Sequence, residues 1–416
     1  MLVMDEEALP DMGTLVSACA GLVTIDQESN VIRLVHHTTQ EYLERTRMDH
    51  FPNAQLKIAG TCLTYLSFDT FASGYCSNDE EMEKSLQYAA SCWGHHTRGS
   101  PEQDNIVRDL ILAFFKQEPK MPCSVQVRHI LQHRFKGYSQ HFPKNVSGLQ
   151  VAASFGLKEI VNMLTDNGAN IEGADSNGMA ALHSTALHGY EEVARLPLEK
   201  GAAIDAVDNT LVRILLERRA HIDARTNFGE TALYLATLEG QGEVVRVLLE
   251  KGAKPNLRET KNDMLPILQV AWEGHRAITR LLLGHGSEPD SKEAFGLTPL
   301  ALAAENGREK VVRLLLDRDG VGPNSKDFYS RTPLRHAAWM GHEAVVRALL
   351  DRGDVDPDSR DKWGWTPLMQ AGEKSHEPVV QLLGPVTSEG LVILPHPPLL
   401  QAVEDGDAAT VRSLIK

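Results

Sequence analysis

The sequence predicts a mainly α-helical fold in which a smaller N-terminal region precedes a repeat solenoid. A segment of about 33 residues recurs between Ser147 and Gly384, and a period of this size is typical of units that bury their apolar faces against one another. Each clear copy has two apolar helical stripes separated by a glycine. All five cysteines lie before the repeats, which indicates that the two regions differ in kind.

The copy that begins at Thr332 shows why each unit is expected to form helix, helix and extended turn. Thr332 suits the N-cap, and Pro333 suits the first helical turn, where no backbone donor is needed. Gly341 is expected to end that helix in a left-handed conformation. A second helix follows and ends before Gly353. Its apolar stripe consists of Val345, Val346, Leu349 and Leu350.

The residues Thr332 to His342 match the pattern Thr-Pro-Leu-x-x-Ala-Ala-x-x-Gly-His, which resembles the ankyrin repeat. The resemblance implies a stack of helix pairs that binds protein partners. We expect no catalysis from it. Ankyrin repeats are predicted over 147–384, with seven copies at 147–177, 178–208, 224–258, 259–291, 292–325, 326–359 and 360–384.

The predicted stack has one irregular point. Only 18 positions separate Ile204 from Ile222, which hold equivalent places in the repeat, and Pro197 is expected to break a helix before them. We therefore predict a truncated repeat near 205–223 that keeps only a second helix, Thr210 to Arg218. It is either a real fault or the trace of a deletion or a misjoined reading frame. Residues 385–416 are expected to form a Pro-rich linker and the start of a further ankyrin-like unit.

The first 146 residues predict a partial winged-helix-like region over 1–50 and a helical linker over 51–146. Two expected strands, Leu22–Asp26 and Val31–Val35, flank a hairpin turn. One helix is expected to end at Gly21, and another to begin at Thr38, which has capping-box spacing to Glu41. Further helices are expected at 53–67, 80–92 and 105–116.

A second resemblance rests on Cys19–Ile25 and on Arg33–Leu43. Both segments look like the winged helix that follows the NACHT ATPase module in STAND-type, NOD-like receptor proteins of filamentous fungi. The segments Thr61–Phe68 and Tyr88–His96 look like its helical continuation. The resemblance implies a nonself-recognition or innate-immunity type of signalling protein in which the repeats sense a ligand.

The resemblance also implies that His36 is a nucleotide sensor, because the corresponding imidazole faces the bound phosphate in family members. The alternative is that His36 simply ends a strand, which we favour because no Gly-Lys dipeptide, and hence no Walker A loop, occurs in the sequence. We expect no cofactor. Cys92, His95 and His96 have no second ligand pair at suitable spacing, so we expect no metal either.

Composition limits the partners and the location that we expect. The net charge of −14 argues against nucleic-acid binding, and no apolar run is long enough to span a membrane. An odd number of cysteines without paired spacing indicates free thiols in a reducing compartment. The expected location is therefore cytoplasmic, with the nucleus possible, and the expected partners are proteins bound through the repeats.

The candidate binding residues lie at the turn tips and at the exposed ends of the first helices. Aromatic residues and arginine carry binding energy well when they are desolvated. The candidates are Phe228, Trp272, Phe295, Tyr329, Arg331, Trp339, Met340, Trp363 and Trp365. Two interpretations stay open: these residues bind a partner, or the tip aromatics of duplicated repeats only stack on one another.

The sequence therefore predicts a non-catalytic ankyrin module for ligand or partner sensing in a NACHT–ankyrin type protein. One alternative is a stand-alone ankyrin adaptor without a switch. Another is part of an ATP-hydrolysing STAND switch whose P-loop is supplied elsewhere, since both ends of the chain look cut. DNA binding by the winged helix ranks below these, because residues 1–50 carry three arginines against nine acidic side chains.

Overall fold

The computed structural model describes residues 23–26, 31–34, 54–67, 87–98, 100–117, 120–130, 142–188 and 209–388. The chain divides into two compact units, Met1–Gly148 and Leu149–Lys416. The boundary lies beside the predicted start of the repeats, so the change of pattern in the sequence coincides with a change of structural unit.

The first unit contains a hairpin of two antiparallel strands, β1 (Val23–Asp26) and β2 (Val31–Leu34). Val23 pairs with Leu34, and Asp26 pairs with Val31. The two predicted strands are thus confirmed to within one residue at each end. The helices expected before and after this hairpin lie outside the described residues, so the winged helix stays a prediction.

Four helices of the first unit pack around a buried aromatic group. They are α3 (Ala54–Leu66), α5 (Gln87–Thr97), α6 (Asn105–Phe115) and α7 (Lys120–Ile130), with the short 3-10 helix η3 (Ser100–Gln103) before α6. The indole of Trp93 is fully buried and meets the ring of Phe114 edge-to-face, with 6.0 Å between centroids. This contact joins α5 to α6. The predicted helices at 53–67 and 105–116 are confirmed, whereas α5 extends past the predicted end at Cys92 to Thr97.

The helix α7 was not predicted from the sequence. Its buried positions include Ser124 and Gln126 as well as Met121, so its apolar residues do not follow a helical period. Pro122 lies in its first turn, where proline is tolerated. A helix whose buried face is partly polar gives little periodic signal.

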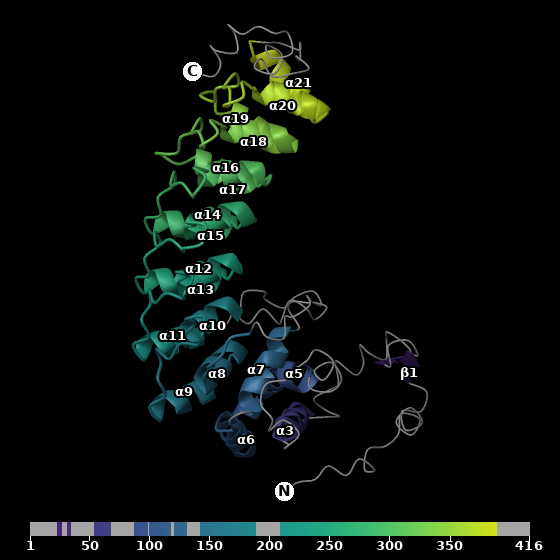
Figure 1. The fold of residues 1–416 in the computed structure, drawn as a ribbon, viewed down its shortest axis with the longest axis vertical. Helices are drawn as coiled ribbons and strands as arrows, with labels where there is room; N and C mark the ends of the chain where they lie inside the picture. Colours follow the sequence, from purple (N-terminus) through teal and green to yellow (C-terminus); the bar gives the residue numbers. More distant parts are fainter. Residues whose placement is uncertain are drawn as a thin grey trace. The chain divides into compact units, whose positions relative to one another are not determined.

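The second unit is a stack of helix pairs (Figure 1). The first helices are α8 (Gly148–Phe155), α10 (Ala181–His188), α12 (Ala232–Leu238), α14 (Pro266–Glu273), α16 (Pro299–Glu305), α18 (Pro333–Met340) and α20 (Pro367–Glu373). The second helices are α9 (Lys158–Asp166), α11 (Thr210–Glu217), α13 (Gly242–Glu250), α15 (Arg276–Gly284), α17 (Glu309–Leu316), α19 (Glu343–Leu350) and α21 (Glu377–Leu383), which is followed by η6 (Gly384–Val386).

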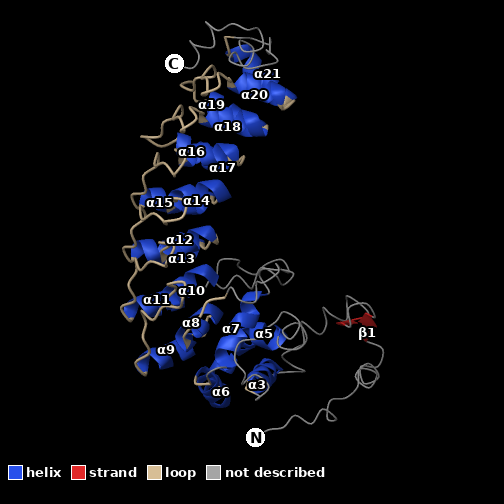
Figure 2. Ribbon diagram, viewed as in Figure 1, coloured by secondary structure: helices blue, strands red, loops and turns tan. Residues whose placement is uncertain are grey.

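The two sets of helices form two rows. From α10 to α20 each first helix contacts the next first helix, and from α9 to α21 each second helix contacts the next second helix. The loops that join successive repeats gather along one edge of the stack (Figure 2). The core between the rows is apolar and includes Leu300, Leu334, Val346 and Leu349, none of which is exposed. The predicted solenoid is confirmed.

The helices around the irregular point are arranged differently from the expected truncated repeat. The predicted second helix is present as α11, but it contacts α10 as well as α9 and α13. The first helix α10 contacts α12 directly, and the backbone N–H of Asn227 donates to the carbonyl oxygen of Asn177 at 2.9 Å. These contacts give α11 a first helix, α10, from earlier in the chain. The segment 189–208 between the two, including Pro197, lies outside the described residues.

Threonine caps begin four of the first helices. In each, the hydroxyl oxygen accepts the backbone N–H three residues later at 3.2–3.3 Å. The capping residues are Thr231, Thr298, Thr332 and Thr366. Three of them precede a proline at the first helical position, as the Thr-Pro pairs predicted.

We expect Thr332→Ala to lower the free energy of unfolding by about 1 kcal/mol, because it leaves the buried N–H of Arg335 without an acceptor. Thr332→Ser keeps the hydroxyl and should cost less. Urea unfolding of both variants checks this. Equal losses for serine and alanine would show that the methyl group matters and the cap does not.

Gly341 ends α18 in the left-handed region with φ 75°, as predicted. A Cβ built there would lie 2.6 Å from the imidazole of His376. That imidazole approaches because its Nε2 lies 3.0 Å from the carbonyl oxygen of Trp339, so it bridges two repeats. His342 bridges in the same way to the carbonyl oxygen of Glu305 at 2.9 Å. The glycine-histidine pairs therefore join neighbouring units.

Candidate protein-binding face

Buried acceptors at the turn tips hold the aromatic candidates in place. The carboxylate of Asp361 accepts the backbone N–H groups of Trp363 and Trp365, at 2.9 and 3.0 Å. Asp327 accepts those of Tyr329 and Arg331, both at 2.8 Å. The chain after each acceptor therefore turns tightly, and the aromatic side chain is directed outward instead of into the core.

The same turn occurs in two other repeats. Glu293 accepts the backbone N–H of Phe295 at 2.8 Å, and the hydroxyl of Thr226 accepts that of Phe228 at 3.2 Å. The acceptor differs between repeats, but the position of the aromatic residue does not. The same local turn thus presents an aromatic side chain at the tip of each of these repeats.

The four predicted tip aromatics are exposed. Phe228 is 50% exposed, Phe295 59%, Tyr329 39% and Trp363 44%. The rings of Tyr329 and Trp363 also stack, with centroids 5.5 Å apart and planes 18° apart. Stacking between neighbours and exposure to solvent therefore coexist in this pair. Phe328 is 60% exposed as well; it was not among the predicted candidates, because it lies one position before the repeated aromatic tip.

A groove of about 440 Å³ lies where α18, α20 and the tips of their repeats meet. Three indoles line it, from Trp339, Trp363 and Trp365. The side chains that complete the lining are polar: Glu305, Arg331, Arg335, His336, Gln370 and Glu373. The structure thus brings four of the sequence candidates together, since Arg331 is also one of them.

The remaining candidates do not line this groove. Trp272, at the end of α14, is 44% exposed, and Met340, at the end of α18, is 45% exposed. Phe228 and Phe295 lie on earlier repeats. The candidate residues therefore form one groove in the later repeats and separate exposed side chains along the rest of the stack.

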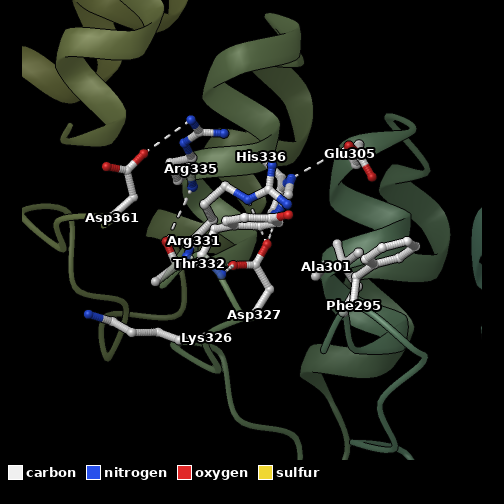
Figure 3. Close-up of polar contacts among 12 residues, drawn as sticks. Phe295, Ala301, Glu305, Lys326, Asp327, Arg331, Thr332, Arg335, His336 and Asp361 are labelled. Carbon is white, nitrogen blue, oxygen red and sulfur yellow. Dashed lines mark hydrogen bonds and ion pairs between the residues drawn. The ribbon is translucent and has the colours of Figure 1, made fainter. Parts of the chain in front are cut away.

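A buried charge network fixes one wall of the groove (Figure 3). The Asp327 carboxylate accepts from Arg331 Nε at 2.6 Å and lies 3.2 Å from His336 Nε2. On the other side of the ring, His336 Nδ1 lies 3.6 Å from a Glu305 carboxylate oxygen. Burial raises the pKa of Asp327, but the bonds from His336 and Arg331 outweigh burial and hold that pKa well below its ordinary value. The bond from His336 likewise lowers the pKa of Glu305.

A second buried ion pair lies beside the first. Arg335 Nη2 donates to Asp361 at 3.1 Å, and the two side chains are 8% and 0% exposed. The guanidinium of Arg335 also lies 5.0 Å from the ring centroid of Trp339, and Lys374 Nζ lies 4.3 Å from the same ring. These cations hold the Trp339 indole, which is half-buried, in one orientation. Asp327, Asp361, Arg335 and His336 were not predicted from the sequence. For the two aspartates the available signal was an acidic residue three positions before the left-handed turn residue, which is Ser330 or Gly364.

Other expectations fall outside this face. His36, the nucleotide-sensor position by resemblance, lies outside the described residues. Within the described ranges, no cluster of three or more His, Cys, Asp or Glu side chains has an arrangement that would hold a metal ion. No helix in the part of the chain that the structure describes is long and apolar enough to cross a membrane.

Comparison with known proteins gives several relatives, each over a limited segment. The chain is 32% identical over 123 residues to the mouse B-cell lymphoma 3 protein homolog, covering 26% of this chain and 28% of that protein. It is 32% identical over 132 residues to the Caenorhabditis elegans ankyrin repeat and KH domain-containing protein mask-1, covering 28% of this chain and 5% of that protein. This chain therefore spans less than a third of the length of either relative.

Among solved structures, the ankyrin repeat domain of human ASB11 is 28% identical, with a TM-score of 0.48, over 57% of this chain and 98% of that domain. A family model described as ankyrin repeats (three copies) matches residues 125–208, 202–259 and 267–361, which together make up more than half of the chain. The chain belongs to the ankyrin repeat family.

Proposed function

We propose that the repeats sense a protein ligand through the turn tips and the groove between α18 and α20. Ankyrin repeats form a protein–protein interaction module, and in this chain the three-indole groove is the observation that supports a specific site. Its volume of about 440 Å³ has room for a few side chains of a partner. Its walls are held by ion pairs, so little side-chain conformational freedom is lost on binding.

We further propose that this sensing acts in a NACHT–ankyrin type signalling protein. The antiparallel hairpin β1–β2 and the helices that follow it support this proposal. Sequencing the full-length message tests it. An in-frame Gly-x-x-x-x-Gly-Lys-Ser/Thr upstream of Met1 is expected. A message that begins at Met1 would leave a stand-alone ankyrin adaptor.

Partner binding is expected to depend on the indoles. We expect Trp339→Ala combined with Trp363→Ala to lower the affinity for a partner by at least about 30-fold. The reason is that a central aromatic residue at an interface contributes about 2 kcal/mol or more. The measurement is a quantitative pull-down from a lysate of the source organism, with wild type and variant side by side. Ile106→Ala is the matched control, since Ile106 is 71% exposed on α6, outside the repeats.

The pull-down contradicts the proposed face if the double variant stays folded and keeps every partner that the wild type captures. Far-UV circular dichroism establishes that the variant is folded. If the Ile106 variant lost the same partners, the binding site would lie outside the repeats.

A further inference from the structure

A row of basic residues runs along the turn tips of five successive repeats. Each precedes the buried acceptor of its turn by one position, and the spacing follows the repeat period. The residues are Arg225, Arg258, Lys292, Lys326 and Arg360. Four of them are exposed, and Arg258 is half-buried. In four of the five repeats an exposed aromatic residue follows three positions later, so the face carries paired basic and aromatic side chains.

Three of these side chains are held by the next repeat. Arg225 Nη1 donates to the carbonyl oxygen of Arg258 at 3.3 Å, and Arg258 Nη1 donates to that of Lys292 at 2.8 Å. Lys292 Nζ donates to the carbonyl oxygen of Lys326 at 2.9 Å. Lysine has three donor hydrogens and arginine five, so each of these cations retains donors for a ligand. These three cations of the row are therefore ordered before any partner binds.

Four acidic groups of the same turns do not face outward, whereas Asp263 is exposed and pairs with Arg258 at 3.0 Å. Glu259, Glu293, Asp327 and Asp361 are 5–7% exposed, and each accepts backbone N–H groups of its own turn. In Figure 3 the side chain of Lys326 points away from the buried network around Asp327. Apart from the Arg258–Asp263 pair, the surface of these tips is consequently basic, although the chain as a whole has a net charge of −14.

The spacing of the row restricts what can bind along it. Packed helices lie about 8–10 Å apart, so neighbouring cations are separated by about that distance. A polyproline-type extended peptide rises about 3.1 Å per residue with three residues per turn. Carboxylates at every third position of such a peptide would all face the row at about 9 Å spacing.

We propose that the row Arg225–Arg258–Lys292–Lys326–Arg360 binds an extended acidic segment of a partner protein with a carboxylate at every third residue. The proposal rests on the proposed function and names the chemistry of the ligand. Single-stranded nucleic acid fits less well. Its phosphates are spaced more closely than the cations of the row, so most of them would lie between cations and not opposite one.

The test uses the full chain and three fluorescent probes. The first is a fifteen-residue peptide of Asp-Thr-Pro repeated five times, and the second has the same composition with the five aspartates contiguous. The third is a fifteen-nucleotide thymidine oligomer. We expect fluorescence anisotropy to show a higher affinity for the first peptide than for either of the other probes. That affinity should fall from low to high salt, because salt screens the charges.

Variants locate the binding. We expect Lys292→Met combined with Lys326→Met to lower the affinity for the spaced peptide, the Asp-Thr-Pro repeat, by about tenfold. Lys292→Arg combined with Lys326→Arg keeps both charges and should bind the spaced peptide with the affinity of the wild type. The matched control is Arg280→Met with Lys310→Met, which removes the same charge from exposed positions on α15 and α17.

Several outcomes would overturn the proposal. These are no binding of the spaced peptide, equal binding of the clustered peptide, tighter binding of the oligomer, or an equal loss in the control variant. None of them bears on the indole groove, which the pull-down tests separately. If the indole variants lose the partner while the row variants keep it, the sensing function holds and the acidic ligand is wrong.

Discussion

Replacing Asp361 with alanine is expected to lower the free energy of unfolding by about 3–5 kcal/mol. The substitution leaves the guanidinium of Arg335 buried without its counter-charge, at a side chain that is 8% exposed. It also removes the acceptor for the backbone N–H groups of Trp363 and Trp365. The groove should lose its shape together with the stability, because both indoles line it.

Urea unfolding followed by circular dichroism measures the effect of Asp361→Ala. The matched control is Glu343→Ala, which breaks an exposed pair with Arg347 that has the same type of contact, 2.9 Å long. That pair should contribute no more than about 1 kcal/mol. Similar losses for the two variants would show that burial of the Arg335–Asp361 pair has no particular consequence.

Acid is expected to destabilise the repeats partly through Asp327. The pKa of this carboxyl lies below its ordinary value in the folded chain, because His336 and Arg331 stabilise the charged form more than burial opposes it. Its contribution to stability is therefore complete above the ordinary value of about 4 and is lost as the pH falls below it, toward the lower folded pKa.

The variant Asp327→Asn should isolate this contribution. We expect it to be less stable than the wild type by about 3 kcal/mol at pH 7, with the difference shrinking below about pH 4. Urea unfolding across pH 2–7 measures both values. Glu309→Gln, at an exposed carboxylate 2.9 Å from Arg313, is the control. It should change neither the stability at pH 7 nor the dependence of stability on pH. A difference for Asp327→Asn that stays constant down to pH 2 would contradict the pKa shift.

Local sequence determined most of the repeat structure. The Thr-Pro pairs placed the caps at Thr298, Thr332 and Thr366, and Gly341 ended its helix in the left-handed region as expected. These features were predictable because a cap, a proline or a left-handed glycine acts within one helical turn. The aromatic tips were predictable for the same reason, since each turn has one register.

Longer-range features were not predictable from the repeat pattern. The sequence suggested that α11 belonged to a repeat without a first helix, whereas in the structure α10 lies against it. The helix α7 was missed because its buried face includes Ser124 and Gln126. The position of α11 depends on contacts between residues far apart in the chain. The helix α7 buries polar side chains, which a search for periodic apolar residues does not detect.

By itself, the sequence determined that this protein is a stack of ankyrin repeats with exposed aromatic tips, because periodic apolar residues specify helices and turn residues specify their ends. Only the tertiary structure decided which tips act together. Trp339, Trp363 and Trp365 come from two repeats and meet in one groove because α18 packs beside α20, and the buried pairs of Asp327 and Asp361 fix its walls. The basic row likewise exists only when the repeats stack, since three of its cations reach the backbone of the next repeat.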